Sequence, residues 1–318
     1  MESITRRNAL RIGGLAAAGL ALGSPRALLA AGRVERKRSI RIAHLTDIHV
    51  EPELRAAEGF AACLRHVQSH ADKPQLILSG GDMVMDSFDQ GEERTKLLWE
   101  LFAKVYKEEC SIPMDGCLGN HDCWGGNKAK SKTTGDEPLW GKKRAMSLLG
   151  MSKPYRSFSR AGWRFILLDS VFVENNSYTG KLDDEQWEWL DSELKADAKT
   201  PTLLLSHIPI LTATQLVGAK KGAAKRELSD SLMMTDSSRF VAAFAKYPNV
   251  KLALSGHVHE VDRIDYQGVS YLCNGAVSGN WWKGRHKQCD EGYAILDLFD
   301  DGTFENRYVP FGWKADKA

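Results

Sequence analysis

The chain lacks the features that mark several common classes of protein. Its six cysteines include no Cys-x-x-Cys pair, which excludes a zinc ribbon. The net charge is only +2 over 318 residues, and the first 32 residues carry four arginines. The remainder is therefore close to neutral, and we expect no nucleic-acid partner. No internal repeat, low-complexity block or Pro/Ser-rich linker divides the sequence. With 43% apolar and 26% charged residues, it predicts one globular domain, which we place at residues 38–312.

A long apolar run is also missing. The apolar stretch at residues 12–22 is too short and too rich in glycine to remain as a membrane-spanning helix. It follows Arg6 and Arg7, and residues 5–11 resemble a twin-arginine export signal, with Ala9 where an aromatic residue is more usual. We therefore predict a signal peptide at residues 1–32, the twin-arginine export machinery as a partner, and a periplasmic protein with no stable membrane span after processing. The alternatives are an N-terminal tail or an uncleaved anchor.

An oxidising compartment would permit disulfides. Cys123 and Cys289 both lie in polar, loop-like stretches, so they are the pair we would join. The alternative is that all the cysteines are isolated buried thiols that behave as small apolar side chains.

Short apolar runs that end in polar clusters alternate with stretches of helical periodicity. This order predicts an α/β protein with a mixed sheet or two packed sheets. The predicted helices are 53–69, 92–107, 184–196 and 237–246. The predicted strands are 39–45, 75–79, 113–118, 155–159, 164–169, 201–206 and 251–255, followed by a strand-rich tail over 261–309.

Polar motifs directly follow five of these strands. Ligands of α/β proteins bind beyond the carboxyl ends of strands, so we expect the motifs to meet in one pocket. They are Asp47-Ile48-His49, Gly80-Gly81-Asp82, Gly119-Asn120-His121-Asp122, His207 and Gly256-His257-Val258-His259.

Carboxylate, imidazole and amide-oxygen ligands in one pocket suit divalent transition metals such as Mn, Fe or Zn. Two cations about 3.5–4 Å apart can hold a phosphoryl group and activate a water molecule. Such a pair needs a shared ligand, and a carboxylate can bridge where an imidazole cannot. We expect Asp82 to be that bridge, with Gly80 and Gly81 bending the backbone toward the metals.

In this order the motifs resemble those of the calcineurin-like metallophosphoesterases, from Asp47 to His259. The resemblance implies a two-sheet β-sandwich flanked by helices, and two divalent metal ions. It implies that Asp47, His49 and His259 bind one metal, that Asn120, His207 and His257 bind the other, and that Asp82 bridges both. His121 would contact the phosphate and protonate the leaving oxygen, oriented by Asp122.

Each motif alone has an ordinary structural explanation. A histidine after a strand is more often structural than a ligand, Asn120 suits a turn, and Asp122 suits a helix cap. The ordered set of five motifs is what favours a metal site. His44, His66 and His70 fit no ligand pattern, and we expect them to be structural; His286 stays unassigned.

At two places the sequence differs from related phosphatase families, which narrows the class of phosphoesterase that it resembles. Met85 stands where purple acid phosphatases have a tyrosine, and residues 83–90 contain no arginine of the kind found in Ser/Thr protein phosphatases. The pattern is similar to that of the bacterial cyclic-nucleotide phosphodiesterases.

Two segments are candidates for substrate contacts. Residues 123–154 hold Trp124 and Trp140 among lysines, as a basic platform or a solvated insertion. In residues 280–286, Trp281 and Trp282 are adjacent, so we expect one in the core and one in the pocket.

The sequence thus predicts hydrolysis of a small phosphate ester, with phosphodiesters favoured, by a hydroxide bound to a dinuclear metal centre. The alternatives are a broad phosphomonoesterase and a non-catalytic metal-binding scaffold, and an export signal disfavours an exonuclease.

Overall fold

The computed structural model describes residues 36–217 and 228–316, and the chain from Lys37 onward forms one compact unit. The predicted signal peptide at residues 1–32 lies outside the described residues. Within the described ranges, no helix is long and apolar enough to cross a membrane.

One sheet has five strands in the order β13-β12-β1-β2-β3. Strand β1 pairs in parallel with β2, and β2 pairs in parallel with β3, whereas β12 pairs antiparallel with β1. Because β1, β2 and β3 run in the same direction, their carboxyl ends meet at one edge of the sheet. The strands are β1 (Arg38–Leu45), β2 (Leu76–Ser79), β3 (Met114–Gly116), β12 (Gly292–Phe299) and β13 (Phe304–Pro310).

The other large sheet has six strands in the order β10-β11-β9-β8-β5-β4. Its centre is parallel, since β8 pairs in this way with both β5 and β9. The strands are β4 (Arg156–Arg160), β5 (Trp163–Leu167), β8 (Thr202–Leu205), β9 (Val250–Ser255), β10 (Val261–Tyr266) and β11 (Val269–Asn274).

Alternating side chains explain why the two sheets pack face to face. In β1, Ile40 and Ile42 join the core between the sheets, whereas Ala43 and Leu45 face a second core beneath helices. The same two-residue period places Leu203 of β8 between the sheets and Leu204 on the opposite face.

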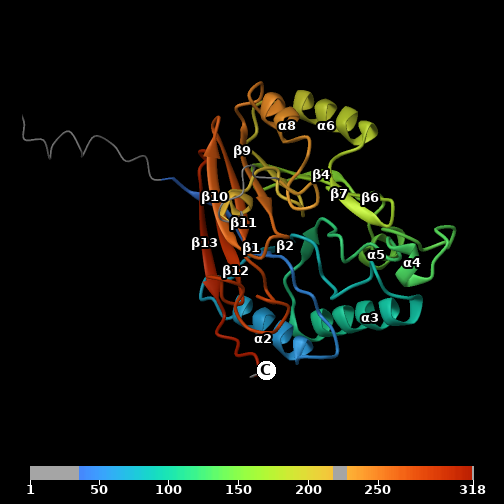
Figure 1. Cartoon of the computed structure of the whole chain (residues 1–318). Coiled ribbons are helices and arrows are strands. Elements are labelled where there is room, and N and C mark those ends of the chain that lie inside the picture. The colour runs from blue at the N-terminus through green and yellow to red at the C-terminus, as the bar shows by residue number, and fades with distance from the viewer. Residues whose placement is uncertain (1–35, 218–227, 317–318) are drawn as a thin grey trace, which may run out of the picture. The chain divides into compact units, whose positions relative to one another are not determined.

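Helices cover both outer faces. Helices α2 (Ala56–Gln68) and α3 (Glu92–Glu109) pack on the first sheet, and α6 (Asp184–Ala196) and α8 (Ser237–Phe244) pack on the second. Figure 1 shows the first pair at the bottom and the second at the top. The predicted two-sheet sandwich flanked by helices is confirmed, and each of the four predicted helices is present.

Several short elements were not predicted. A hairpin of β6 (Val171–Glu174) and β7 (Ser177–Gly180) forms a separate two-stranded sheet. Its turn residues Asn175 and Asn176 have φ values of 51° and 59°, the two positive values of a type I′ turn. The Asn-Asn pair was the signal for this hairpin. The short helices α4 (Lys128–Ser131), α5 (Lys143–Leu149) and α7 (Thr214–Val217) lie in connecting segments.

The proposed disulfide was wrong, because all six cysteines are free. Cys123 is buried, and its thiol donates to the Gly119 carbonyl. The sulfur of Cys289 accepts a hydrogen bond from the Val261 amide. The alternative of isolated thiols is therefore correct, and five of the six are buried, Cys110 being partly exposed.

Candidate metal centre

The predicted ligands lie just beyond the carboxyl ends of strands from both sheets. Five of them have backbone conformations that non-glycine residues rarely adopt. The φ values are 55° for Asp47, 48° for His49, 52° for Asp82, 71° for His257 and 54° for His259. Each such residue costs roughly 1–3 kcal/mol. Strain concentrated on one cluster of side chains indicates a functional site that the surrounding fold holds in place.

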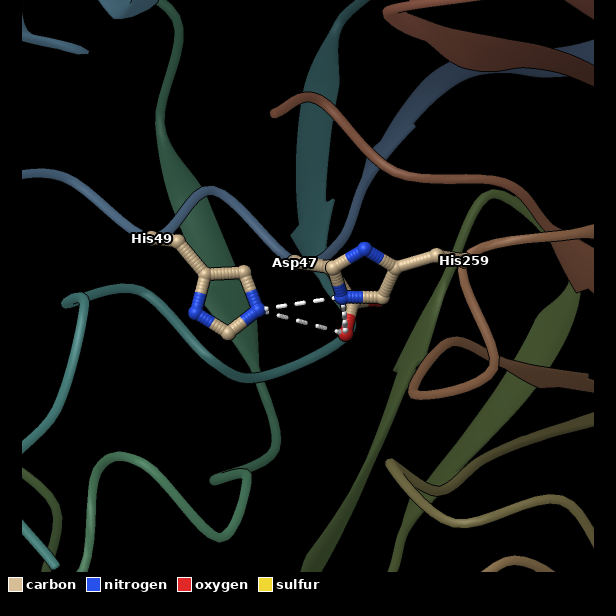
Figure 2. A group of neighbouring side chains, drawn as sticks. All are labelled: Asp47, His49 and His259. Atoms are coloured by element: carbon tan, nitrogen blue, oxygen red, sulfur yellow. Dashed lines mark hydrogen bonds and ion pairs between the residues drawn. The ribbon is translucent and has the colours of Figure 1, made fainter. Parts of the chain in front are cut away.

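One group comprises Asp47, His49 and His259, and Figure 2 shows their ligand atoms facing one another. The Nε2 atoms of His49 and His259 are 3.1 Å apart. The Asp47 Oδ1 atom lies 3.3 Å from Nε2 of His259 and 3.9 Å from Nε2 of His49. Two imidazole nitrogens and a carboxylate oxygen thus converge on one point.

The second group comprises Asp82, His207 and His257, with Asn120 beside them. The His207 Nε2 atom is the centre of this group. It lies 3.2 Å from Asp82 Oδ2, 3.1 Å from His257 Nδ1 and 3.1 Å from Asn120 Oδ1. The structure therefore brings all seven predicted ligands together in two adjoining groups.

Asp82 joins the two groups through a single atom. Its Oδ2 lies 3.6 Å from Nε2 of His49 in the first group and 3.2 Å from Nε2 of His207 in the second. Its Oδ1 accepts a 2.8 Å hydrogen bond from the backbone amide of His121. This is the geometry that a bridging carboxylate requires.

Backbone carbonyls set the orientation of three of the imidazole rings. Nδ1 of His207 lies 2.8 Å from the Gly80 oxygen, and Nδ1 of His259 lies 2.6 Å from the Gly279 oxygen. Nε2 of His257 lies 2.8 Å from the oxygen of Ser231. These contacts turn the other nitrogen of each ring toward the cluster.

The pKa values of the ligand side chains are those of a site for cations. Burial lowers the pKa of His49 well below its ordinary value and that of His257 to about 4. Burial raises the pKa of Asp82, but His207 and His121 outweigh it and hold the pKa below its usual range. Burial lowers the pKa of His207 and of His259, but Asp82 and Asp47 outweigh burial and raise it, to about 9 for His207. The carboxylates thus attract protons to these two rings, and a divalent cation would take the place of those protons.

The close contacts provide a test of whether the site fits metals. Unprotonated nitrogens 3.1 Å apart, as in His49 and His259, repel unless a proton or a cation lies between them. Nδ1 of His49 is buried and has no hydrogen-bond partner within residues 36–217 and 228–316, so no backbone carbonyl orients this ring as one does for the other three. The seven residues therefore fit a pair of cations bridged by Asp82.

Glycines are required where the loops pass the ligands. A Cβ atom on Gly119 would overlap Oδ1 of Asp82 and lie 2.5 Å from its amide nitrogen. A Cβ atom on Gly256 would overlap Oγ1 of Thr46 and Oδ2 of Asp47. Gly81 has a φ of 92°, so the predicted bend before Asp82 is present.

His121 lies at the edge of the centre. Its ring is in edge contact with that of His49, with centroids 4.7 Å apart, and its side chain is 26% exposed. Nδ1 is buried and lies 4.0 Å from Asp86 Oδ1. One nitrogen of this ring also lies within 4.8 Å of ligand atoms of His49 and Asp82, so His121 borders the space where the two ligand groups meet.

Asp122 has other partners than His121. Its carboxylate accepts hydrogen bonds of 2.9, 2.9 and 2.8 Å from the backbone amides of Asp82, Met83 and Gly119. Asp122 therefore fixes the loops that carry the bridging aspartate. Sequence reasoning missed Asp86 as the carboxylate near His121, although it stands only four residues after Asp82.

The adjacent tryptophans Trp281 and Trp282 have different surroundings. Trp282 is 1% exposed and packs in the core, whereas Trp281 is partly exposed beside His259. The predicted division is confirmed, but both residues lie in a turn and not on a strand. Trp124 is 2% exposed with Arg144 against its ring, so it is no platform for a substrate.

The family match and the similar proteins cover the part of the chain that holds this site. The sequence profile of the calcineurin-like phosphoesterases matches residues 40–261. The chain is 27% identical over 292 residues to a 3′,5′-cyclic-nucleotide phosphodiesterase of Nostoc sp., covering 87% of this chain and 96% of the relative. It is 26% identical over 282 residues to the 3′,5′-cyclic adenosine monophosphate phosphodiesterase of Escherichia coli, covering 83% and 87%. A dimetal phosphatase from Danio rerio has a similar fold, with a TM-score of 0.56 and 15% identity over 87% of this chain and all of that chain.

Proposed function

The chain belongs to the calcineurin-like phosphoesterase family, and from that premise we propose that it is a two-metal phosphodiesterase whose substrates include 3′,5′-cyclic nucleotides. The observation that carries the metal centre is the position of Asp82 Oδ2 between Nε2 of His49 and Nε2 of His207. The substrate class is supported by the two cyclic-nucleotide phosphodiesterases that match more than 80% of the chain.

Two bound cations, with Mn, Fe or Zn as the candidates, would supply Lewis-acid polarisation of the phosphate and a lowered pKa of a coordinated water. The protein would supply the ligands that hold the two cations. Asp47, His49 and His259 would hold one cation, Asn120, His207 and His257 the other, and Asp82 both.

His121 is the group placed to move a proton. Its backbone amide is fixed on Asp82, and its side chain is the partly exposed ring at the edge of the cluster. A nitrogen of this ring would donate a proton to the leaving oxygen as the P–O bond breaks. Asp86 Oδ1, 4.0 Å from Nδ1, is the nearby carboxylate.

Comparison of a diester with a monoester tests this function. We expect the metal-loaded protein to have a higher kcat/KM for bis-(4-nitrophenyl) phosphate than for 4-nitrophenyl phosphate, and to convert cyclic AMP to a monophosphate. A clear preference for the monoester, with no turnover of cyclic AMP, would identify a broad phosphomonoesterase. No turnover of any ester by the metal-loaded protein would indicate a binding scaffold.

We also propose export to the periplasm by the twin-arginine route, supported by Arg6 and Arg7 before the short apolar run. Substitution of both by lysine keeps the charge but removes the guanidinium pair. The precursor should then stay in the cytoplasm, as fractionation and immunoblotting would show. Unchanged appearance in the periplasm would contradict this route.

A further inference from the structure

The segment after β11 contains a turn that places the indole of Trp281 against two of the candidate metal ligands. The Trp281 ring lies 4.5 Å from that of His259 at an angle of 36°, and 6.0 Å from that of His49. Both histidines belong to the same ligand group. Trp281 is partly exposed, so part of its surface remains open beside the place where a phosphate would bind.

The position of this indole is fixed by its neighbours. Trp282 is anchored, because its Nε1 donates a 2.9 Å hydrogen bond to the carbonyl of His49 and its backbone amide donates to Ser278. The turn closes through a 2.8 Å bond from the Asn280 amide to the Gly284 oxygen. A stacking surface held in this way loses little entropy when a ligand binds.

The backbone of the turn is strained in the manner of functional sites. Trp281 and Trp282 have successive φ values of 49° and 65°, in the left-handed region that bulky residues avoid. The buried Trp282 holds this conformation, and the consequence is that Trp281 points toward the ligands and not into the core.

A second aromatic ring completes a corner with Trp281. His286 lies 6.0 Å from the indole at 85° and 5.8 Å from the ring of His259. Its segment is held by paired backbone hydrogen bonds of 2.9 and 2.8 Å between His286 and Cys289. The corner is therefore a rigid aromatic wall on the His259 side of the centre.

Other tryptophans considered for substrate contact are less suited. Trp124 is buried beneath Arg144. Trp140 donates its Nε1 proton to the Gly125 carbonyl and has the Lys128 ammonium 5.2 Å from its ring centroid. Neither makes a ring contact with a ligand histidine in the part of the chain that the structure describes.

We infer that Trp281 stacks on the base of the nucleotide substrate, with His286 bordering it, while the phosphate occupies the metal centre. This assignment rests on the proposed function and adds a specificity-determining residue to it. The indole lies 4.5 Å from one ligand imidazole and 6.0 Å from another, so a base on its open surface would lie beside a phosphate at the metal centre. A purine or pyrimidine ring on a tryptophan gains from stacking whichever base it is.

The test compares a substrate that has a base with one that lacks it. For Trp281→Ala, kcat/KM for cyclic AMP should fall about five- to hundredfold, the range that stacking of one base spans. The kcat/KM for the cyclic phosphate of 1,3-propanediol, followed by ³¹P NMR, should change less than about twofold. Trp281→Phe should restore most of the cyclic AMP activity, and Trp140→Ala should leave the ratio of the two substrates unchanged.

A binding measurement separates this inference from the proposed function. Calorimetry should show that Trp281→Ala weakens the binding of AMP but not of ribose 5-phosphate to the metal-loaded protein. If both substrates or both ligands lose equally, or neither loses, the stacking assignment is overturned. If the wild type hydrolyses neither ester, the proposed function fails, and the calorimetric comparison still decides the role of Trp281.

Discussion

At the scale of single residues, the candidate ligands could be predicted because each is a chemically distinctive side chain at the end of a strand. Their hydrogen-bond partners could not. His207 and His259 are oriented by the carbonyls of Gly80 and Gly279, and every residue has a carbonyl, so no sequence pattern identifies these two. Asp122 shows the same limit, because its partners are three backbone amides.

Substitution of His121 tests its role as a proton donor. His121→Ala should lower kcat by about 10²–10⁴-fold for an alkoxide leaving group, the usual contribution of general acid catalysis. The loss should be much smaller for 4-nitrophenolate, which leaves without protonation. Metal content, measured by elemental analysis, should stay at the wild-type value. Equal losses for both leaving groups would instead assign His121 to substrate binding.

His44 links stability to pH. The ring is fully buried, accepts a 2.9 Å hydrogen bond from Asn274, and has no partner for its Nε2. Burial lowers its pKa from 6.5 to about 4. Above pH 6.5 both the folded and unfolded states are neutral here. Between pH 6.5 and 4 only the unfolded chain takes up the proton, so stability is lost as the pH falls, by about 2 kcal/mol at pH 5.

His44→Gln removes this titration and keeps a polar side chain. Urea unfolding with EDTA at pH 7.5 and pH 5 should therefore show a smaller loss of stability in the variant than in the wild type. The same pH dependence in both proteins would mean that the His44 ring is protonated in the folded state.

At the scale of elements, the strands and long helices were predictable because their apolar residues recur with clear periods. Short elements depend on turn chemistry. The β6–β7 hairpin, with its Asn-Asn turn, was not predicted, whereas the β4–β5 hairpin matches two predicted strands, 155–159 and 164–169. One of Trp281 and Trp282 was predicted to lie in the core and the other in the pocket, which is confirmed. The reason differs, because the two side chains are separated by a turn with left-handed backbone and not by the alternation of a strand.

The loop after β3 should tolerate no side chain where it passes the bridging aspartate. In Gly119→Ala, the new methyl group would overlap Oδ1 of Asp82 and press on its amide. We expect the variant to lose metal from both positions and to lose most phosphodiesterase activity. Gly91→Ala is a matched control, because its methyl group would meet only the Ser131 oxygen at 3.8 Å. Wild-type metal content in Gly119→Ala would show that the two loops can move apart.

At the scale of the whole molecule, two packed sheets bring residues that are distant in the sequence to one edge. Asp47 and Asp82 follow strands of one sheet, and His207, His257 and His259 follow strands of the other. The order of the motifs indicated this convergence. The sequence did not indicate which segments would border the pocket, since Trp124 proved buried and Trp281 partly exposed.

The most direct test of the account is a titration of metal-free protein with Mn²⁺, in which bound metal and the hydrolysis of bis-(4-nitrophenyl) phosphate are measured together. We expect the activity to reach its plateau at two metals per chain. Asp82→Asn should bind less metal at both positions and stay inactive, while Asp89→Asn, whose carboxylate pairs with Lys130, should follow the wild type. Full activity without bound metal, or retention of both metals by Asp82→Asn, would contradict a dinuclear centre bridged by Asp82.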